Sequence, residues 1–110
     1  MTTFPAPKPI RRVVSKPLRQ SAQDKRCTLR IGGCLPGNET VVLAHLRGPW
    51  ALGTGIKPHD FAAIYCCQSC HDRLDGRRSS PPPLIDVLRA LMETQSMMLE
   101  AGLITVRGDQ

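Results

Sequence analysis

Two pairs of cysteines constrain the fold of this chain more than any other feature of its sequence. Cys27 and Cys34 are separated by six residues, and Cys67 and Cys70 by two. A C-x2-C pair at a turn can bind one tetrahedral Zn²⁺ ion, with Zn–S distances of about 2.3 Å. The first pair is wider, but the Gly-Gly turn before Cys34 lets the chain fold back and direct both sulfurs at one point. We therefore predict that these four cysteines hold one structural zinc ion.

The size and composition of the chain support this prediction. Its 110 residues leave room for one domain, and only four of them are aromatic (two Phe, one Tyr and one Trp). A core this small needs disulfides, a metal or oligomerisation to be stable. The N-terminus lacks the apolar stretch of a secretory signal, and no apolar run is long enough to span a membrane. We expect a cytoplasmic protein without membrane contact, where disulfides rarely persist and cysteines serve metal binding or catalysis.

The positive charge lies at the N-terminus. Residues 1–26 hold seven Lys and Arg against a single acidic residue, so they account for the whole net charge of +6. The first sixteen residues are also rich in proline, which predicts a flexible basic arm over 1–16. Such an arm would bind the phosphate backbone of DNA through a salt-dependent, sequence-independent attraction. The alternative is a solvated tail that only aids solubility.

Short elements joined by turns are predicted for the zinc-bound domain, residues 17–78. The segment over 46–60 contains three Gly and two Pro, so we expect it to be irregular. Apolar, β-branched runs favour strands, and Gly76 should end the helix that follows the second cysteine pair. The predicted elements are a helix over 17–26, a short strand from Cys27, strands over 41–45 and 61–66, and a helix over 67–75.

The C-terminal segment, residues 79–110, is predicted to be an amphipathic helix that packs on the same core. Ser79, Ser80 and three prolines mark its beginning, because proline is tolerated in a first turn. Gly102 stands where a C-cap glycine belongs, and GLITV after it suggests a short strand. Seven apolar residues recur at helical spacing and are expected to face the core: Leu84, Val87, Leu88, Leu91, Met92, Met98 and Leu99.

Histidines and carboxylates near the second cysteine pair indicate a reaction centre. His71 and Asp75 are four residues apart, so both project from one helix face and can hold a divalent cation with positions left for substrate oxygens. His45 ends a predicted strand, where its imidazole can take a proton from water that attacks a phosphodiester. The alternatives are a structural role for His45 and a fifth zinc-ligand role for His71. Asp60 is expected to pin the irregular loop by local hydrogen bonds.

Two further side chains are given structural interpretations. Cys66 would point away from Cys67 in an extended run, so we expect a buried thiol that is not a zinc ligand. His59 lies in the irregular segment without an evident partner, and we expect it to be solvated.

The set AHLR, GTGIKPHD and CQSCHDRLDGR resembles the HNH, or ββα-metal, endonucleases. Over about residues 24–78 it looks most like the small YbcO-like prophage nucleases, and more distantly like the RecA-dependent phage nuclease Ref. The resemblance implies an α+β, zinc-stapled, HNH-like domain from a phage or a bacterial host. It also implies hydrolysis of DNA with Mg²⁺ or Mn²⁺, and a recombination protein as the expected class of partner.

The resemblance assigns roles to individual residues. It implies that Cys27, Cys34, Cys67 and Cys70 bind structural zinc. It implies that His45 is the general base, that His71 and Asp75 bind the catalytic cation, and that Asp60 falls near the motif's Asn. Two positions depart from the pattern: Ala44 stands where many HNH enzymes place a metal-binding Asp or His, and Asp60 replaces Asn.

Three functions are consistent with these residues. The first is a metal-dependent DNA endonuclease or nickase. The second is a non-catalytic zinc module that binds DNA or a protein partner. A zinc-ribbon structural subunit fits the cysteines but leaves His45, His71 and Asp75 unexplained. The sequence does not determine an oligomeric state.

Overall fold

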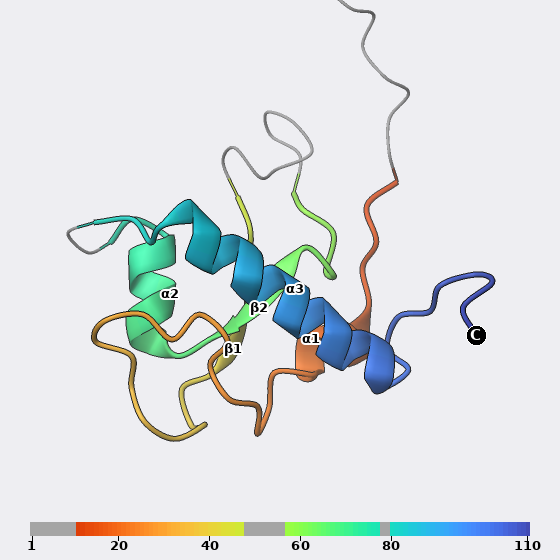
Figure 1. The fold of residues 1–110 in the computed structure, drawn as a ribbon, viewed down its shortest axis with the longest axis horizontal. Coiled ribbons are helices and arrows are strands. Elements are labelled where there is room, and N and C mark those ends of the chain that lie inside the picture. Colours follow the sequence, from red (N-terminus) through yellow and green to blue (C-terminus); the bar gives the residue numbers. More distant parts are fainter. Residues whose placement is uncertain (1–10, 48–56, 78–79) are drawn as a thin grey trace, which may run out of the picture.

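The structure is a computed structural model that describes residues 11–47, 57–77 and 80–110. Two antiparallel strands form a small sheet beside which the helices pack, and the long C-terminal helix crosses the sheet (Figure 1). The elements follow the order α1 (Lys16–Gln20), β1 (Val42–His45), β2 (Ala63–Cys66), α2 (Gln68–Leu74) and α3 (Leu84–Glu100). The described part of the chain is therefore α+β, as predicted.

Strand pairing fixes where the histidine at the end of β1 lies. Val42 pairs with Cys66 and His45 with Ala63, so the last residue of β1 faces the first residue of β2. The backbone N–H of Leu46 donates to the carbonyl of Ala62 and extends the pairing by one residue. β2 is buried along its whole length. The predicted strands over 41–45 and 61–66 are thus confirmed in slightly shorter form.

Helix α2 begins and ends where the sequence predicts. The Cys67 side chain accepts a hydrogen bond from the backbone N–H of Cys70 and caps the helix. Gly76 has φ of 77°, a left-handed conformation that glycine adopts without steric cost, and the helix ends before it. His71 therefore lies in the middle of α2 and Asp75 at its C-cap.

Helix α3 begins after the three prolines rather than within them. Pro83 is the N-cap residue, with ψ of 139° and no side-chain cap, and Leu84 is the first helical residue. A residue that precedes proline is pushed towards extended conformations, so the Pro-Pro-Pro run delays the helix. Gly102 has φ of 74° just beyond the C-cap, as predicted.

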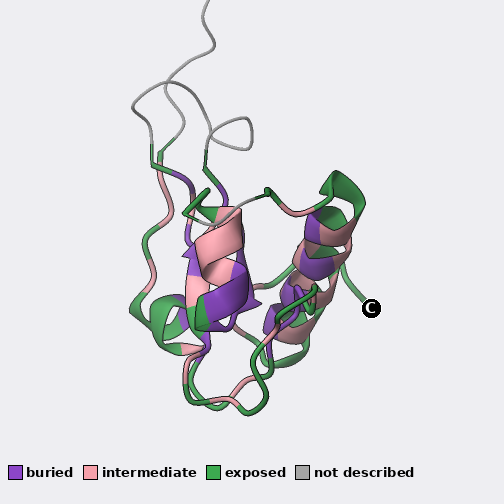
Figure 2. Ribbon diagram, turned by 90° about the vertical axis from the view of Figure 1, so that its left-hand side faces the viewer, coloured by how far each residue is buried: buried purple, intermediate pink, exposed green. Residues whose placement is uncertain are grey.

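The core face of α3 differs from the predicted apolar stripe. Its buried residues are Val87, Ala90, Thr94 and Met98, which face the strands, while the opposite side is exposed (Figure 2). Four members of the predicted stripe are exposed: Leu84, Leu88, Met92 and Leu99. Apolar residues occur on two sides of α3, so hydrophobicity alone does not select the buried side. The side with the small Ala90 and with Thr94, which accepts from the backbone N–H of Tyr65, can approach β2 closely and is the one that is buried.

The segment over 27–34 forms a loop rather than the expected strand. Arg30 has φ of 46°, a left-handed conformation that interrupts any extended run. Helix α3 holds this loop instead, because the guanidinium of Arg89 donates to the carbonyls of Thr28 and Leu29 at 2.9 and 2.6 Å. The hydroxyls of Thr28 and Thr94 lie 2.9 Å apart in the buried interior. The Gly32-Gly33 turn forms as predicted.

Helix α1 is shorter than the predicted helix over 17–26. Ser15 caps its beginning and Ser21 its end. Asp24 has φ of 62°, so the helix cannot continue to residue 26. No strand forms over 102–106, where turns follow α3. Tyr65 connects α1 to the sheet, because its hydroxyl donates to Oγ of Ser21 at 2.8 Å.

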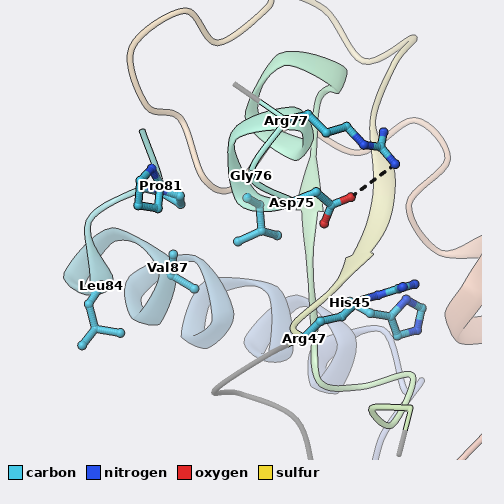
Figure 3. A pocket seen from close by; sticks show the side chains of 10 residues that line it. His45, Arg47, Asp75, Gly76, Arg77, Pro81, Leu84 and Val87 are labelled. Atoms are coloured by element: carbon cyan, nitrogen blue, oxygen red, sulfur yellow. Dashed lines mark ion pairs between the residues drawn. The ribbon is translucent and has the colours of Figure 1, made fainter. Parts of the chain in front are cut away.

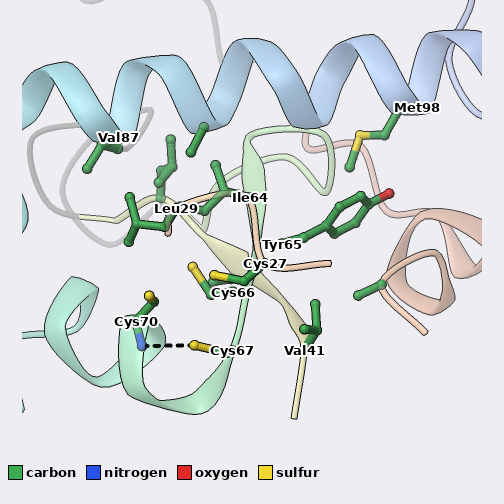
Figure 4. Close-up of a cluster of buried hydrophobic side chains, with 14 of the residues drawn as sticks. Cys27, Leu29, Val41, Ile64, Tyr65, Cys66, Cys67, Cys70, Val87 and Met98 are labelled. Carbon is green, nitrogen blue, oxygen red and sulfur yellow. Dashed lines mark hydrogen bonds between the residues drawn. The ribbon is translucent and has the colours of Figure 1, made fainter. Parts of the chain in front are cut away.

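The core joins the cysteines to the sheet and α3 (Figure 4). Leu29 of the loop over residues 27–34, which we call the cysteine loop, packs with Ile64 and Tyr65 of β2 against α3, and Met98 lies near the tyrosine ring. Among the described residues, no helix is long and apolar enough to span a membrane.

Candidate functional site

Four sulfur atoms meet between the cysteine loop and α2. The Sγ atoms of Cys27, Cys34, Cys67 and Cys70 all lie within 4.8 Å of one another, and Sγ of Cys34 is 3.7 Å from that of Cys67. In a tetrahedral site with Zn–S bonds of about 2.3 Å, the sulfurs are about 3.8 Å apart. The arrangement fits a metal ion such as zinc, as the spacing predicts.

Backbone N–H groups point at one of these sulfurs. Sγ of Cys67 accepts from the N–H of Leu35 at 3.4 Å and from the N–H of Cys70 at 3.5 Å. Such donors stabilise a thiolate and orient it. The N–H groups at the start of α2 and after Cys34 thus hold the two cysteine pairs close together.

The thiols differ in the direction of their pKa shifts. A hydrogen bond from Cys66 is the main cause that lowers the pKa of Cys27 to about 4, although burial opposes it. Burial is the main cause that raises the pKa of Cys34 to about 11, and it also raises that of Cys70. Four thiolates this close together repel one another, so a bound cation is needed to hold them all charged.

Cys66 is buried but lies outside the group of four sulfurs. Its side chain is hydrogen-bonded to Cys27, which raises the pKa of the Cys66 thiol. The predicted burial is confirmed, and the side chain contacts the cluster through Cys27. Cys66 is therefore placed as an outer hydrogen-bond donor to a ligand sulfur.

A second centre forms at the other end of the strands. Nε2 of His45 lies 2.9 Å from Oδ1 of Asp60. The imidazole is partly buried, with 18% of its side chain exposed, and Asp60 is fully buried. Within the described part of the chain, the ring of His45 makes no second hydrogen bond, so Nδ1 keeps its bonding capacity.

Asp60 receives hydrogen bonds on both carboxylate oxygens. Oδ2 accepts from the backbone N–H of Ser15 at 2.7 Å and from Nε of Arg19 at 2.8 Å. Burial alone would raise the pKa of Asp60, but the hydrogen bonds from Ser15, His45 and Arg19 outweigh it and hold that pKa below its ordinary value. Asp60 does more than pin a local loop, because three of its partners come from distant segments.

The N-terminal segment over 11–15 lies along the loop that carries Asp60. The N–H of Val13 donates to Nδ1 of His59 at 2.8 Å, and the N–H of Asp60 donates to the carbonyl of Val13 at 3.0 Å. Arg12 donates to the carbonyl of Pro58. The described end of the predicted arm is thus bound to the domain, and residues 1–10 lie outside the described residues. The expectation that His59 is solvated is wrong, because the ring also stacks on Phe61 with centroids 4.7 Å apart.

The second predicted pair lies on α2. Nε2 of His71 is 3.1 Å from Oδ2 of Asp75, at the i and i+4 positions of the helix end. The guanidinium of Arg77 approaches the same carboxylate oxygen at 3.8 Å. Both side chains are partly exposed, with 28% of His71 and 24% of Asp75 accessible to solvent.

A groove of about 640 Å³ is lined by His45 from one of these pairs and by Asp75 from the other (Figure 3). His45, Arg47, Asp75 and Arg77 line one side of it, and apolar residues before and within α3 line the other. Two guanidinium groups, an imidazole and a carboxylate thus face one cleft from two different elements. The sequence did not single out Arg47 and Arg77, although both stand inside quoted motifs.

The structure does not gather the predicted reaction centre into one set of ligands. Among the described residues, the cysteines are the only group of three or more His, Cys, Asp or Glu side chains whose ligand atoms converge. His71 and Asp75 offer two ligand atoms, and Asp75 is the only other predicted site residue that lines the groove with His45. Ala44 is fully buried and supplies no ligand.

Sequence reasoning missed the residues that hold Asp60. Ser15 and Arg19 are 45 and 41 residues away from Asp60 along the chain. The signals in the sequence were an aspartate before an apolar strand and a basic short helix, but nothing in the sequence connects the two.

Comparisons with known proteins agree on one family. A family model described as "Putative nuclease YbcO" matches residues 16–103. A protein described as "Putative nuclease YbcO" from Escherichia coli (strain K12) is 38% identical over 95 residues, which cover 79% of this chain and 95% of that protein. Its namesake from Enterobacteria phage 82 gives the same values.

A solved structure is similar in fold. It is described as "Structure of a putative bacteriophage protein from Escherichia coli str. K-12 substr. MG1655". The TM-score is 0.61 at 33% sequence identity, and the match covers 78% of this chain and 100% of that chain.

Proposed function

This chain belongs to the family described as "Putative nuclease YbcO", and from that premise we propose that it is a metal-dependent DNA endonuclease or nickase with an HNH-type centre. The observation that carries the proposal is the groove between β1 and α2. It is lined by His45, which is oriented by a buried carboxylate, and by Asp75, the partner of His71. The strand–strand–helix order of β1, β2 and α2 supports the proposal of an HNH-type centre.

His45 is proposed as the general base. In the tautomer with the proton on Nε2, the ring donates to Oδ1 of Asp60 and leaves the Nδ1 lone pair for a water molecule. Asp60 holds the ring and stabilises the imidazolium that forms when Nδ1 takes the proton. In this assignment His45 touches the reacting water, whereas Asp60 acts through His45.

Arg47 and Arg77 are proposed to bind the phosphate. Guanidinium groups match phosphate geometry and keep their charge at all relevant pH values. Arg77 is 66% exposed and pairs with Asp75 at 3.8 Å, a contact loose enough to be exchanged for a phosphate oxygen. These contacts read the DNA backbone, so we expect weak sequence preference.

His71 and Asp75 are proposed to hold the catalytic cation. An imidazole and a carboxylate at i and i+4 suit Mg²⁺ or Mn²⁺ and leave the remaining positions to water and phosphate oxygens. A divalent cation bound there would polarise the phosphate and stabilise the leaving oxygen. The four cysteines are proposed to hold structural zinc, which stabilises the fold.

One assay tests the nuclease proposal. Purified protein is incubated with supercoiled plasmid and Mg²⁺ or Mn²⁺, beside a His45→Ala variant with the same zinc content and the same circular dichroism spectrum. The wild type is expected to nick the plasmid at least about a hundredfold faster, the lower end of what a general base contributes. Equal rates would exclude His45 as the base.

The second candidate is a zinc module that binds DNA without cutting it. Ala44 favours it, because that buried methyl group stands where many HNH enzymes have a cation ligand. If the protein binds DNA but does not nick it with any divalent metal, this alternative is established and the proposed nuclease activity is overturned.

A further inference from the structure

We propose that Arg19 is a positioning residue for the nuclease centre, acting on His45 through Asp60. This inference rests on the proposed role of His45 as the base. Arg19 belongs to α1 and is absent from the groove lining, so its link to the reaction centre is the carboxylate that it binds.

The two oxygens of Asp60 have separate tasks. Oδ1 faces Nε2 of His45 at 2.9 Å, and Oδ2 is bound by Nε of Arg19 at 2.8 Å and by the N–H of Ser15 at 2.7 Å. The terminal torsion of an aspartate is broad, so one anchored oxygen is needed to keep the other directed at the imidazole. Two donors on Oδ2 provide that anchor.

Charge gives Arg19 a role that the backbone N–H of Ser15 cannot fill. Asp60 is fully buried, and an ionised carboxylate in that position needs a compensating cation. Arg19 is the nearest one, whereas the guanidinium of Arg12 lies 3.9 Å from Oδ1. Without Arg19, Asp60 loses both an orienting bond and its closest charge partner.

A matched control lies on the same helix. Lys16 is an exposed cation in α1, so Lys16→Ala removes the same charge from the same element without touching Asp60. Any loss of DNA attraction through net charge is therefore common to Lys16→Ala and Arg19→Ala. Only the second variant disturbs the carboxylate.

The experiment compares wild type, Arg19→Ala, Arg19→Lys and Lys16→Ala by plasmid nicking and by NMR of the histidine rings. Arg19→Ala is expected to lower kcat about tenfold, which corresponds to roughly 1.4 kcal/mol, with KM no higher than in Lys16→Ala. Arg19→Lys should restore most of kcat. The Nε2 proton of His45, bonded to Asp60 and slowly exchanging in wild type and Lys16→Ala, should exchange fast in Arg19→Ala.

Equal kcat in Arg19→Ala and Lys16→Ala, with the Nε2 proton of His45 unchanged, would overturn the positioning role. Arg19→Gln, which keeps the aliphatic stem, is measured in the same way, so misfolding of the alanine variant does not decide the outcome. If the wild type does not nick DNA at all, the proposed function fails, whereas the NMR comparison still tests the link from Arg19 to His45.

Discussion

Nε2 of His45 lies 2.9 Å from Oδ1 of Asp60, across the junction of β1 and the loop that enters β2. This contact joins an imidazole at the edge of an open groove to a carboxylate that solvent does not reach. It leaves Nδ1 as the ring atom that can still accept a proton. The same carboxylate ties α1 and the residues before it to the candidate site.

Asp60→Asn should destabilise the fold. An amide at this site turns its NH₂ either towards the two donors from Ser15 and Arg19 or towards Nε2 of His45, whose proton must then move to Nδ1, and in both orientations it lacks the charge that pairs with Arg19. A buried mismatch of this kind costs about 1–3 kcal/mol. Urea denaturation would measure it, with Asp109→Asn as an exposed control. Equal midpoints for the two variants would contradict the hydrogen-bond pattern around Asp60.

Stability should also depend on pH through Asp60. Its pKa is lowered in the folded state, so its contribution is complete above the unfolded value of about 3.9 and is lost as pH falls through the folded value. The difference in unfolding free energy between wild type and Asp60→Asn should therefore shrink with acidification below about pH 4. The cysteines titrate identically in both proteins, so their effect cancels. A constant difference would argue against a paired, ionised Asp60.

The four cysteines should bind one zinc ion per chain, and Cys66 should not be a ligand. We expect Cys70→Ala to lose stoichiometric zinc and to unfold on mild chelation. Cys66→Ala should keep one zinc, with affinity reduced about tenfold to a hundredfold through the lost hydrogen bond to Cys27. Metal analysis and chelator titration would separate the two variants. Equal zinc loss from both would refute the assignment of ligands.

Arg77 should contact a phosphate. Arg77→Gln is expected to weaken DNA binding for all sequences and to reduce the slope of log K against log salt by about 1. Arg107→Gln removes the same charge from an exposed position in the C-terminal turn and serves as the control. Fluorescence anisotropy at several salt concentrations would report the slopes. Identical slopes for the two variants would remove Arg77 from the interface.

The buried face of α3 can be tested with two methionines. Met98 is 0% exposed and Met92 is 62% exposed. Met98→Ala should cost about 2–5 kcal/mol of unfolding free energy, because it leaves a cavity. Met92→Ala should change it by less than about 0.5 kcal/mol. Thermal or urea unfolding would give the comparison, and similar losses would mean that Met92 is also covered.

Local patterns predicted the short-range features well. Gly76 and Gly102 correctly predicted the ends of α2 and α3, because a residue in the left-handed conformation ends a helix whatever surrounds it. Runs of apolar, β-branched residues predicted both strands. The strand predicted from Cys27 was wrong, and the predicted face of α3 was right only in part, at Val87 and Met98. Arg89 and Thr94 bind the loop around Cys27 to α3 through contacts between residues more than 60 positions apart.

The sequence by itself determined the cysteine pairs, the helix that carries His71 and Asp75, and the family. These depend on spacing within a turn, on the period of a helix and on motif identity, all of which are local. Only the tertiary structure decided that Asp60 is buried beneath His45 and bound by Arg19, and that Asp75 shares a groove with His45. Burial removes solvent as a hydrogen-bond partner, so Asp60 must bond to whatever the fold brings near, and that choice is not encoded by neighbours in the chain.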